Sequence, residues 1–249
     1  MYPLRYFPSG HVYIEPGDDC DMVVDSLLET EYGEEFCLAS GFDEEFISRL
    51  MEAGFLVMSA KLAEEELTGE ESREAATMRV KRPELFYVLL PKLHLVRSAL
   101  FFPELHIKKS ICRFLPRYEL RIDTDFDLIL DKCVQIHNAD WLTPPLVNAL
   151  KCLHRQNTRA KPVSFGAYRD GELKAGEIGV TIGRVYTSYS GYYEEDNAGT
   201  VQMILMAKWL EQTGFDFLDL GMPLDYKTHL GARDITPHRF VELFRAARR

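Results

Sequence analysis

The segment from residue 108 to residue 121 contains the side chains whose types and spacing most directly suggest chemistry. Residues 79–121 hold ten lysine or arginine side chains against three glutamates. Lys109, Arg113 and Arg117 are four positions apart, so on a helix they would share one face. A row of cations on one face is suited to the phosphates of a nucleic acid. The alternative is an ordinary solvated surface.

The distribution of charge sets this segment apart from the beginning of the chain. The 249-residue sequence has a formal net charge of −10. Residues 1–78 contain 19 acidic and 4 basic side chains, whereas residues 79–249 contain 20 acidic and 25 basic ones. Opposite signs in the two parts favour a polyanionic partner for the basic part, although acidic residues also promote solubility alone.

Other signatures of catalysis or targeting are absent from the sequence. It has no G-x-S-x-G, no phosphate-binding P-loop, no H-E-x-x-H and no dinucleotide-binding glycine motif after a strand. The five cysteines form no C-x-x-C pair, which predicts reduced thiols and no metal site. No apolar run approaches the roughly 20 residues of a membrane span, and no signal peptide is evident. We therefore expect a cytoplasmic protein that does not bind membranes.

The spacing of apolar residues predicts a mixed α+β protein in which helices and strands position these groups. Helices are expected over residues 43–54, 104–114, 125–137, 197–212 and 236–247, and a further helix opens at Pro144. Strands are expected over residues 11–14, 118–122, 163–168, 172–180, 184–190 and 215–220, with two more in 85–102 on either side of Pro91. Residues 61–78 are predicted to form a polar insert.

The order of the last elements matches the core of the acetyltransferase-like (GNAT) fold, in which a three-stranded meander is followed by a helix, a strand and a helix. An acyl-CoA enzyme of that class needs a glycine-rich turn before the central helix to bind pyrophosphate. Here the turn carries Glu194, Glu195 and Asp196. Three carboxylates would repel a pyrophosphate, so we do not expect acetyl-CoA as a cofactor.

Several short motifs, taken in order, resemble the leucyl/phenylalanyl-tRNA–protein transferases. They span roughly residues 7–244 and include Phe7-Pro8, Phe36 to Asp43, Pro103 to Ser110, Arg113-Phe114, Asp125-Phe126, Asp140-Trp141-Leu142, Gly176 with Gly179-Val180, Asp219, His229 to Ala232, and Ile235, Arg239 and Phe240. The resemblance implies an enzyme that moves an amino acid from aminoacyl-tRNA to a protein N-terminus, within the N-degron pathway. It also implies a small N-terminal domain, a GNAT-like C-terminal domain and no cofactor.

The resemblance assigns roles to particular residues. Lys108, Lys109, Arg113, Arg117 and Arg121 fall on the family's tRNA-binding cluster. Trp141 matches a tryptophan near the terminal adenosine and the aminoacyl ester, where a flat ring can stack on an unpaired base. A core or rim anchor is the other interpretation of Trp141.

The expected catalytic residues are Asp219 and Tyr189. Asp219 matches the family's active-site aspartate, but Gly221 stands where the family has a glutamine, and Tyr189 stands where it has a glutamate. Asp219 would manage the proton of the amine, and Tyr189 would supply a hydroxyl for positioning. The alternative is a tyrosine-rich wall on a degenerate site, in a catalytically inactive tRNA- or peptide-binding relative.

The expected substrate pocket departs from the family at Glu177, which replaces an apolar methionine. A carboxylate in an apolar pocket costs several kcal/mol unless it is paired. Gly191 replaces a second methionine and would widen the pocket, while Tyr186 would flank the donor side chain. These changes favour a basic donor, with arginine expected. In the alternative interpretation, Glu177 forms an ordinary ion pair with Lys174 or Arg184 on an adjacent strand.

Together these features predict an α+β protein with a small acidic N-terminal α+β domain over residues 1–78 and a GNAT-like catalytic domain over residues 79–249. The expected partners are aminoacyl-tRNA and protein or peptide N-termini, with no membrane, and we expect a monomer.

Overall fold

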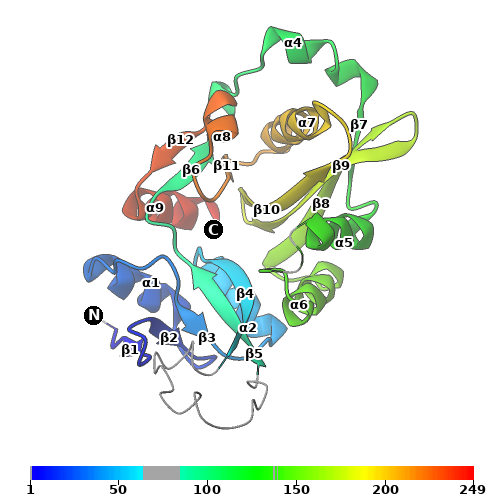
Figure 1. The fold of residues 1–249 in the computed structure, drawn as a ribbon. Coiled ribbons are helices and arrows are strands. Elements are labelled where there is room, and N and C mark those ends of the chain that lie inside the picture. The colour runs from blue at the N-terminus through cyan, green and yellow to red at the C-terminus, as the bar shows by residue number, and fades with distance from the viewer. Residues whose placement is uncertain (1, 64–84, 137, 139) are drawn as a thin grey trace, which may run out of the picture.

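The computed structural model describes residues 2–63, 85–136, 138 and 140–249. Most of the polar insert predicted over residues 61–78 lies outside the described residues. The remaining chain forms two mixed sheets with helices packed on them (Figure 1). The α+β class predicted from the sequence is confirmed.

The first sheet has the strand order β1-β2-β3-β5-β4. Its strands are β1 (Arg5–Tyr6), β2 (Val12–Ile14), β3 (Leu38–Ala39), β4 (Leu56–Ala63) and β5 (Leu85–Lys92). The sheet therefore draws its β5 strand from beyond residue 78, and the division into domains at that residue stays a prediction. Pro91 lies inside β5 rather than between two strands; β6 (Arg97–Leu100) begins five residues past the end of β5.

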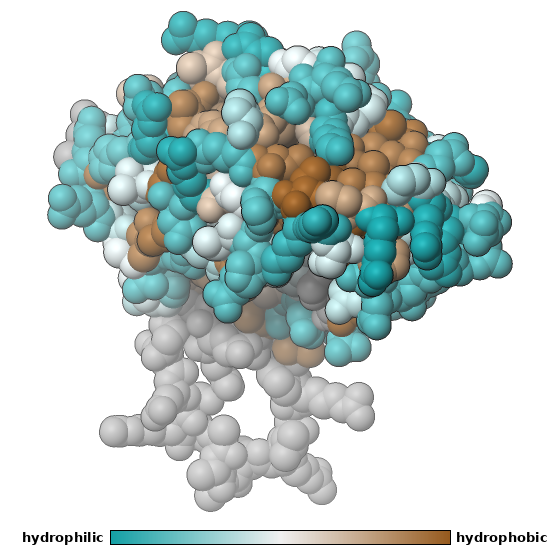
Figure 2. All heavy atoms as spheres, turned by 90° about the horizontal axis from the view of Figure 1, so that it is seen from above, coloured by the Kyte–Doolittle hydropathy of each residue, from teal (hydrophilic) through white to brown (hydrophobic). Residues whose placement is uncertain are grey.

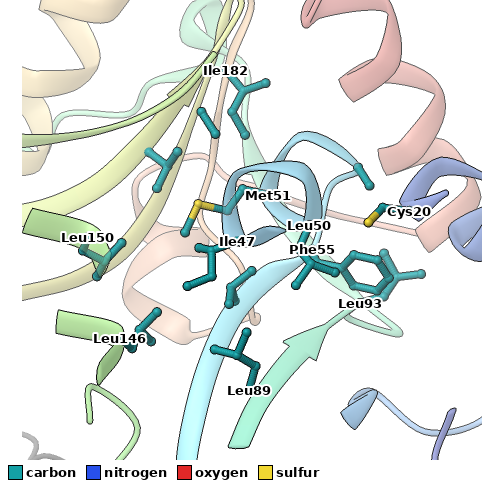
Figure 3. Close-up of a cluster of buried hydrophobic side chains, with 14 of the residues drawn as sticks. Cys20, Ile47, Leu50, Met51, Phe55, Leu89, Leu93, Leu146, Leu150 and Ile182 are labelled. Atoms are coloured by element: carbon teal, nitrogen blue, oxygen red, sulfur yellow. The ribbon is translucent and has the colours of Figure 1, made fainter. Parts of the chain in front are cut away.

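Two helices accompany the first sheet, α1 (Cys20–Glu29) and α2 (Glu44–Glu52). Asp43 starts α2 as its N-cap, because its carboxylate accepts a hydrogen bond from the Phe46 amide at 3.0 Å. Four apolar residues of α2, spaced as one helical stripe, are buried: Phe46, Ile47, Leu50 and Met51. This stripe meets Leu89 of the first sheet, Ile182 of the second and two leucines of α6 (Pro144–Arg155), so both sheets share one core (Figure 3).

The second sheet has the strand order β12-β6-β11-β10-β9-β8-β7. Beyond β6, its strands are β7 (Glu119–Ile122), β8 (Ala160–Arg169), β9 (Glu172–Ile182), β10 (Val185–Tyr193), β11 (Phe217–Asp219) and β12 (Arg233–Ile235). Strands β8, β9 and β10 form the predicted antiparallel meander, and β11 returns parallel to β10. The order of elements predicted for a GNAT-like core is thus present.

Helices cover both faces of the second sheet (Figure 1). Helix α7 (Ala198–Gln212) packs on the face that carries Phe165 and Tyr186. Helices α5 (Phe126–Ile136) and α6 (Pro144–Arg155) pack on the face that carries Ile178 and Val180. Because side chains alternate across a strand, neighbouring residues of β9 and β10 face different helices. The chain ends in α9 (Pro237–Ala247), for which Thr236 is the N-cap, as predicted.

One predicted helix is wrong. Residues 104–114 do not form a continuous helix: the segment contains only the single turn α4 (Lys109–Cys112). Two short turns of 3₁₀ helix, Phe102–Glu104 and Leu115–Arg117, flank it. The backbone is extended at Leu105 and Lys108. The amide of His106 donates to the Leu230 carbonyl at 2.9 Å, so a contact with a distant segment replaces a helical hydrogen bond.

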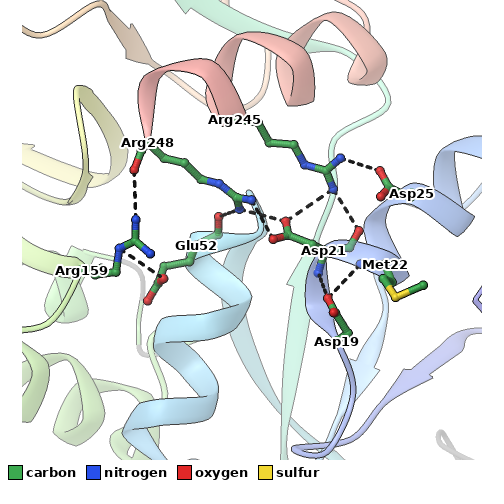
Figure 4. A network of polar contacts seen from close by, with 8 residues as sticks. All are labelled: Asp19, Asp21, Met22, Asp25, Glu52, Arg159, Arg245 and Arg248. Atoms are coloured by element: carbon green, nitrogen blue, oxygen red, sulfur yellow. Dashed lines mark hydrogen bonds and ion pairs between the residues drawn. The ribbon is translucent and has the colours of Figure 1, made fainter.

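An ion-pair network ties α9 to the N-terminal elements (Figure 4). Arg248 donates to both oxygens of Asp21 at 2.9 and 2.7 Å, and Arg245 donates to Asp25 at 2.6 Å. A cleft of about 640 Å³ is lined by Asp21, Arg245 and Arg248, among others, and by none of the predicted site residues. Arg245 and Arg248 hold the C-terminal helix against α1.

Candidate functional site

The parallel strands β10 and β11 pair over only three residues each and then separate. The ladder joins residues 185–187 to residues 217–219, while β10 continues to Tyr193 and the chain after Asp219 turns away toward α8 (Asp225–His229). In its ladder with β9, β10 has a register shift between Ser188 and Ser190, just past the end of its pairing with β11. The ends of parallel strands, at the point where they diverge, are a usual place for a ligand site. Predicted site residues 189, 191, 219 and 221 all lie beside this divergence.

Asp219 is fully buried and held by an ion pair that the sequence pattern does not reveal. Arg97 donates to its two carboxylate oxygens, from Nε at 2.8 Å and from Nη2 at 2.5 Å. The Gly221 amide donates to the same carboxylate at 3.0 Å. Burial alone would raise the pKa of Asp219, but the Arg97 charge and hydrogen bonds outweigh burial and lower it. The carboxylate is therefore ionised, and its oxygens are already bonded to Arg97 and to the Gly221 amide.

Arg97 is itself buried at 1% exposure and has further partners. Its Nη1 donates to the Gly54 carbonyl at 3.0 Å, and its guanidinium lies 3.8 Å from the ring centroid of Phe240. The pair therefore joins β6 and β11 to α9 and to the turn after α2. Only one feature of the sequence indicated that Arg97 is buried: it directly precedes the small and apolar residues Ser98 to Leu100.

Tyr189 and Trp141 lie together where the second sheet meets β4. The Tyr189 hydroxyl accepts a hydrogen bond from the Val57 amide at 3.1 Å, and its ring centroid is 6.5 Å from that of Trp141. The carbonyl of Trp141 accepts hydrogen bonds from the amide and hydroxyl of Ser59 at 3.1 and 2.8 Å. Both aromatic residues therefore contribute to holding β4 in place.

Glu177 lies on the other face of the sheet, beneath α7. It is 3% exposed and pairs in register with Gly191 of β10. Burial raises the pKa of Glu177 to about 7, against the opposing influence of Ser188, Tyr186, Lys227 and Gln202. Among the described residues, neither its Oε1 nor the Tyr186 hydroxyl has a hydrogen-bond partner.

The alternative in which Glu177 pairs with Lys174 or Arg184 is not the arrangement found. Lys174 instead pairs with Glu172, and Arg184 pairs with Asp216 at 2.8 Å. Both of these pairs lie toward the exposed turns of the sheet, away from the buried carboxylate. Within the parts of the chain that the structure describes, no cation lies within ion-pair distance of Glu177.

Lys227 of α8 is a buried residue of the site that the sequence did not single out. Its ammonium donates to the carbonyls of Leu220 and Met222, at 2.5 and 2.8 Å, and so shapes the turn after β11. Burial lowers its pKa to about 8, although the charges of Asp219 and Glu177 act in the opposite direction. Its only sequence signal was a lysine within a short run that reads as a loop.

The predicted basic segment is exposed along most of its length. Lys108, Lys109, Arg113 and Arg117 are exposed, and none is in an ion pair with another described residue. The guanidinium groups of Arg113 and Arg117 lie 4.9 and 5.4 Å from the ring centroid of Phe114. Seen from above, this side of the molecule shows apolar surface bordered by polar side chains (Figure 2).

Arg121 differs from the other members of the basic segment. It forms an ion pair with Glu119 at 2.9 Å and stacks 4.3 Å over the ring of Tyr168. Both contacts lie on the β7–β8 edge of the sheet. The Arg121 guanidinium is therefore less available to a phosphate than the other four cations, because it already contacts Glu119 and Tyr168.

Neither a metal centre nor a membrane span is found among the described residues. In the described ranges, no group of three or more histidine, cysteine or acidic side chains is arranged to hold a metal ion. None of the described helices is both long and apolar enough to cross a membrane.

Comparison with known proteins finds a family match over the part of the chain that contains β10 and β11. The sequence profile described as leucyl/phenylalanyl-tRNA protein transferase matches residues 99–245. The leucyl/phenylalanyl-tRNA–protein transferase of Pseudomonas putida strain W619 is 34% identical over 151 residues, which are 59% of this chain and 66% of the relative. That of Pseudomonas aeruginosa strain PAO1 is 30% identical over the same shares. The match thus spans just under two thirds of these relatives.

Solved structures resemble the chain more distantly. FemX superposes with a TM-score of 0.44 at 10% identity, covering 98% of this chain and 84% of FemX. L-PGS from Bacillus licheniformis gives a TM-score of 0.41 at 11% identity, with 99% and 89% covered. Similarity at this level does not indicate function.

Proposed function

The chain belongs to the leucyl/phenylalanyl-tRNA protein transferase family, and we propose from this membership that it transfers an amino acid from an aminoacyl-tRNA to the N-terminus of a protein or peptide. The observation that carries the proposal is that the matched residues, 99–245, include the divergence of β10 and β11 and nearly all of the residues around it.

The reaction needs few groups from the protein. The α-amine of the acceptor attacks the ester carbon, a C–N bond forms, the ester C–O bond breaks, and the proton lost by the amine ends on the released ribose hydroxyl. The protein must hold a neutral amine, orient it and stabilise the oxyanion. We assign Asp219 to the support of this site, since its carboxylate fixes the Gly221 amide and Arg97 rather than standing open to a substrate.

The exposed basic segment supports binding of the tRNA. Four cations without carboxylate partners among the described residues can displace counterions from phosphates at no cost in broken ion pairs. Phe114, flanked by two guanidinium groups, adds a planar surface beside them. Arg121 would contribute less, because it already pairs with Glu119.

For the donor we propose a cationic amino acid, with arginine as the expected case. Glu177 is buried, lacks an ion-pair partner among the described residues, and has an Oε1 that accepts no hydrogen bond from them. A guanidinium group could supply both the charge and the hydrogen bond; Gly191 lies opposite Glu177 in register. A leucine or phenylalanine side chain would leave the carboxylate without a cationic partner.

A non-catalytic tRNA- or peptide-binding protein is the second candidate. The observation that favours it is that the two predicted catalytic side chains are occupied: Asp219 by Arg97, and the Tyr189 hydroxyl by the Val57 amide. Binding of aminoacyl-tRNA without any transfer would be its signature.

The proposal is tested by incubating the protein with a full set of radiolabelled aminoacyl-tRNAs and a panel of peptides with different N-termini. Transfer of label to peptide, greatest for arginyl-tRNA, is expected. Retention of all label on tRNA despite binding would instead establish the second candidate. Transfer of leucine or phenylalanine but not arginine would overturn the donor assignment alone.

Binding is tested with Lys109, Arg113 and Arg117 replaced by serine. The slope of log affinity against log salt should fall by about 0.7–0.9 for each phosphate that the variant no longer neutralises. The matched control replaces Lys151, Arg155 and Arg159, which removes the same charge from a face where these side chains already have acidic partners. Equal effects of the two triple substitutions would contradict the assignment of the basic segment.

A further inference from the structure

His94, in the connection between β5 and β6, is a buried side chain that the functions described so far do not use. It is 3% exposed, and neither of its ring nitrogens has a hydrogen-bond partner among the described residues. A buried polar group without a partner is costly and calls for an explanation. A ligand that completes its hydrogen bonding would be one.

The two nitrogens of His94 face different surroundings. Nδ1 lies 3.6 Å from Oε1 of Glu35. Glu35 is held in place by Lys92, at 2.8 Å from its Oε2, and by the Leu95 amide, at 3.2 Å from its Oε1. A carboxylate on the Nδ1 side favours the proton on Nδ1 and leaves the lone pair on Nε2.

Nε2 lies on the other side of the ring, beside Gly221. A Cβ atom built at Gly221 would be 3.4 Å from Nε2 and 3.5 Å from a methyl group of Leu56. Gly221 itself follows β11 at the divergence, and its amide is fixed by Asp219. Family resemblance puts a glutamine side chain at position 221. Here there is no side chain, and an imidazole nitrogen without a partner among the described residues lies within van der Waals distance of the place where a Cβ atom would be.

The location is buried but shallow. Leu95 and Met222, which directly follow His94 and Gly221, are 43% and 50% exposed. A pocket of about 220 Å³ lies beside the same connection; Leu93 and Leu95 line it together with residues of α1, the turn after α1 and α9, but His94 and Gly221 do not. Strand β6, which follows the connection that carries His94, is joined to Gly221 by the hydrogen bond from the Ser98 amide to the Gly221 carbonyl, at 2.7 Å.

The ring is neutral under ordinary conditions. Burial, followed by the charges of Arg97 and Lys92, lowers the pKa of His94 to about 3, against the opposing charges of Asp219 and Glu35. These four charged residues are the ionisable groups that act on the ring. A neutral imidazole keeps one nitrogen as a hydrogen-bond acceptor, which an imidazolium would lose.

We infer that Nε2 of His94 accepts a hydrogen bond from the α-amine of the acceptor and aims the amine's lone pair at the aminoacyl ester. The inference rests on the proposed transferase function and extends it to a catalytic residue outside the matched span. It adds no new reactant: the C–N bond forms, the ester C–O bond breaks and the proton passes to the released ribose oxygen. Glu35 acts as the positioning residue through Nδ1.

The test compares His94→Gln with His94→Asn in the full-length protein. A glutamine amide reaches the place of Nε2, whereas an asparagine amide reaches only that of Nδ1. With the donor that the wild type transfers, we expect His94→Asn and His94→Ala to lower kcat by about 10²-fold, and His94→Gln to stay within about tenfold of wild type. Imidazole added to His94→Ala should restore part of kcat.

The matched control is His154→Ala, because His154 stacks on the ring of Phe126 and bonds to the Pro162 carbonyl, far from the divergence. It should transfer as well as wild type at equal folded concentration, which melting curves establish for every variant. If the wild type transfers and His94→Asn transfers within about threefold of it, only the inference about His94 fails. If the wild type transfers no amino acid from any tRNA, the proposed function fails and the role of His94 fails with it.

Discussion

Two buried carboxylates in the same sheet, Asp219 of β11 and Glu177 of β9, have opposite electrostatic environments. Asp219 faces the side shared with the first sheet and α9, where Arg97 meets both of its oxygens and its pKa is lowered. Glu177 faces α7, where polar side chains but no ion-pair partner surround it among the described residues, and its pKa is raised to about 7.

The difference shows how a buried charge can be assigned. A carboxylate that is already paired with a cation is available for structure but not for a ligand, because a ligand would have to displace the cation. A carboxylate whose burial is uncompensated gains most from a cationic ligand. The residue with the better motif match, Asp219, is therefore the weaker candidate for direct contact with substrate, and the departure from the family, Glu177, is the stronger one.

The largest effect should come from breaking the Asp219 pair. Asp219→Asn leaves the guanidinium of Arg97 buried without its counter-charge, which is expected to lower the free energy of unfolding by about 3–5 kcal/mol. Urea denaturation measures the change. The double substitution of Arg97→Met with Asp219→Leu should recover much of the loss, since no charge is then left unpaired. A loss below about 1 kcal/mol in the single variant would contradict the structural role.

Glu177 should show the opposite behaviour with pH. Its folded pKa of about 7 lies above its ordinary value of 4.5, so the folded protein binds the proton more tightly. The free energy of unfolding should therefore fall as pH rises from 4.5 to about 7, by about 3 kcal/mol from this group.

Glu177→Gln removes this titration, so its advantage over wild type should grow across that window and stay constant above about pH 8. Denaturation at about pH 5 and about pH 8 for both proteins measures the difference. An advantage that does not change between the two pH values would mean that Glu177 is compensated in the folded state.

Replacing Glu177 by methionine should change which aminoacyl-tRNA the protein prefers as donor. Without the carboxylate, nothing in the proposed pocket attracts a cationic side chain, and the methionine adds apolar surface. The ratio of kcat/KM for leucyl- or phenylalanyl-tRNA over arginyl-tRNA should rise about tenfold or more. Competition between differently labelled aminoacyl-tRNAs gives this ratio directly. A ratio equal to that of wild type would remove Glu177 from the pocket.

The smallest effect is expected from Tyr189→Phe. Like Asp219, Tyr189 already has a hydrogen-bond partner within the protein. The variant leaves the Val57 amide without its partner and should lower the free energy of unfolding by about 1 kcal/mol. Transfer per folded molecule should change less than about threefold. A large drop in transfer with unchanged stability would return Tyr189 to a catalytic role.

The sequence by itself determined the local elements and their order. The alternation of apolar residues predicted β8, β9 and β10, and a capping threonine with a proline predicted α9, because strand and helix periodicity depend on neighbours a few residues apart. The basic segment and Glu177 were also readable, since charge and its departure from a motif need no coordinates. The motifs were sufficient to indicate the family.

Only the tertiary structure decided which of these groups meet. Arg97 and Asp219 are 122 positions apart, and Val57 and Tyr189 are 132 apart. No local pattern encodes such pairs, because they arise where separate strands and sheets pack. The same cause broke the helix predicted over 104–114, where the His106 amide bonds to Leu230, and brought His94 beside Gly221. Periodicity is set by short-range sterics, whereas the partners of a buried polar group are set by the whole fold.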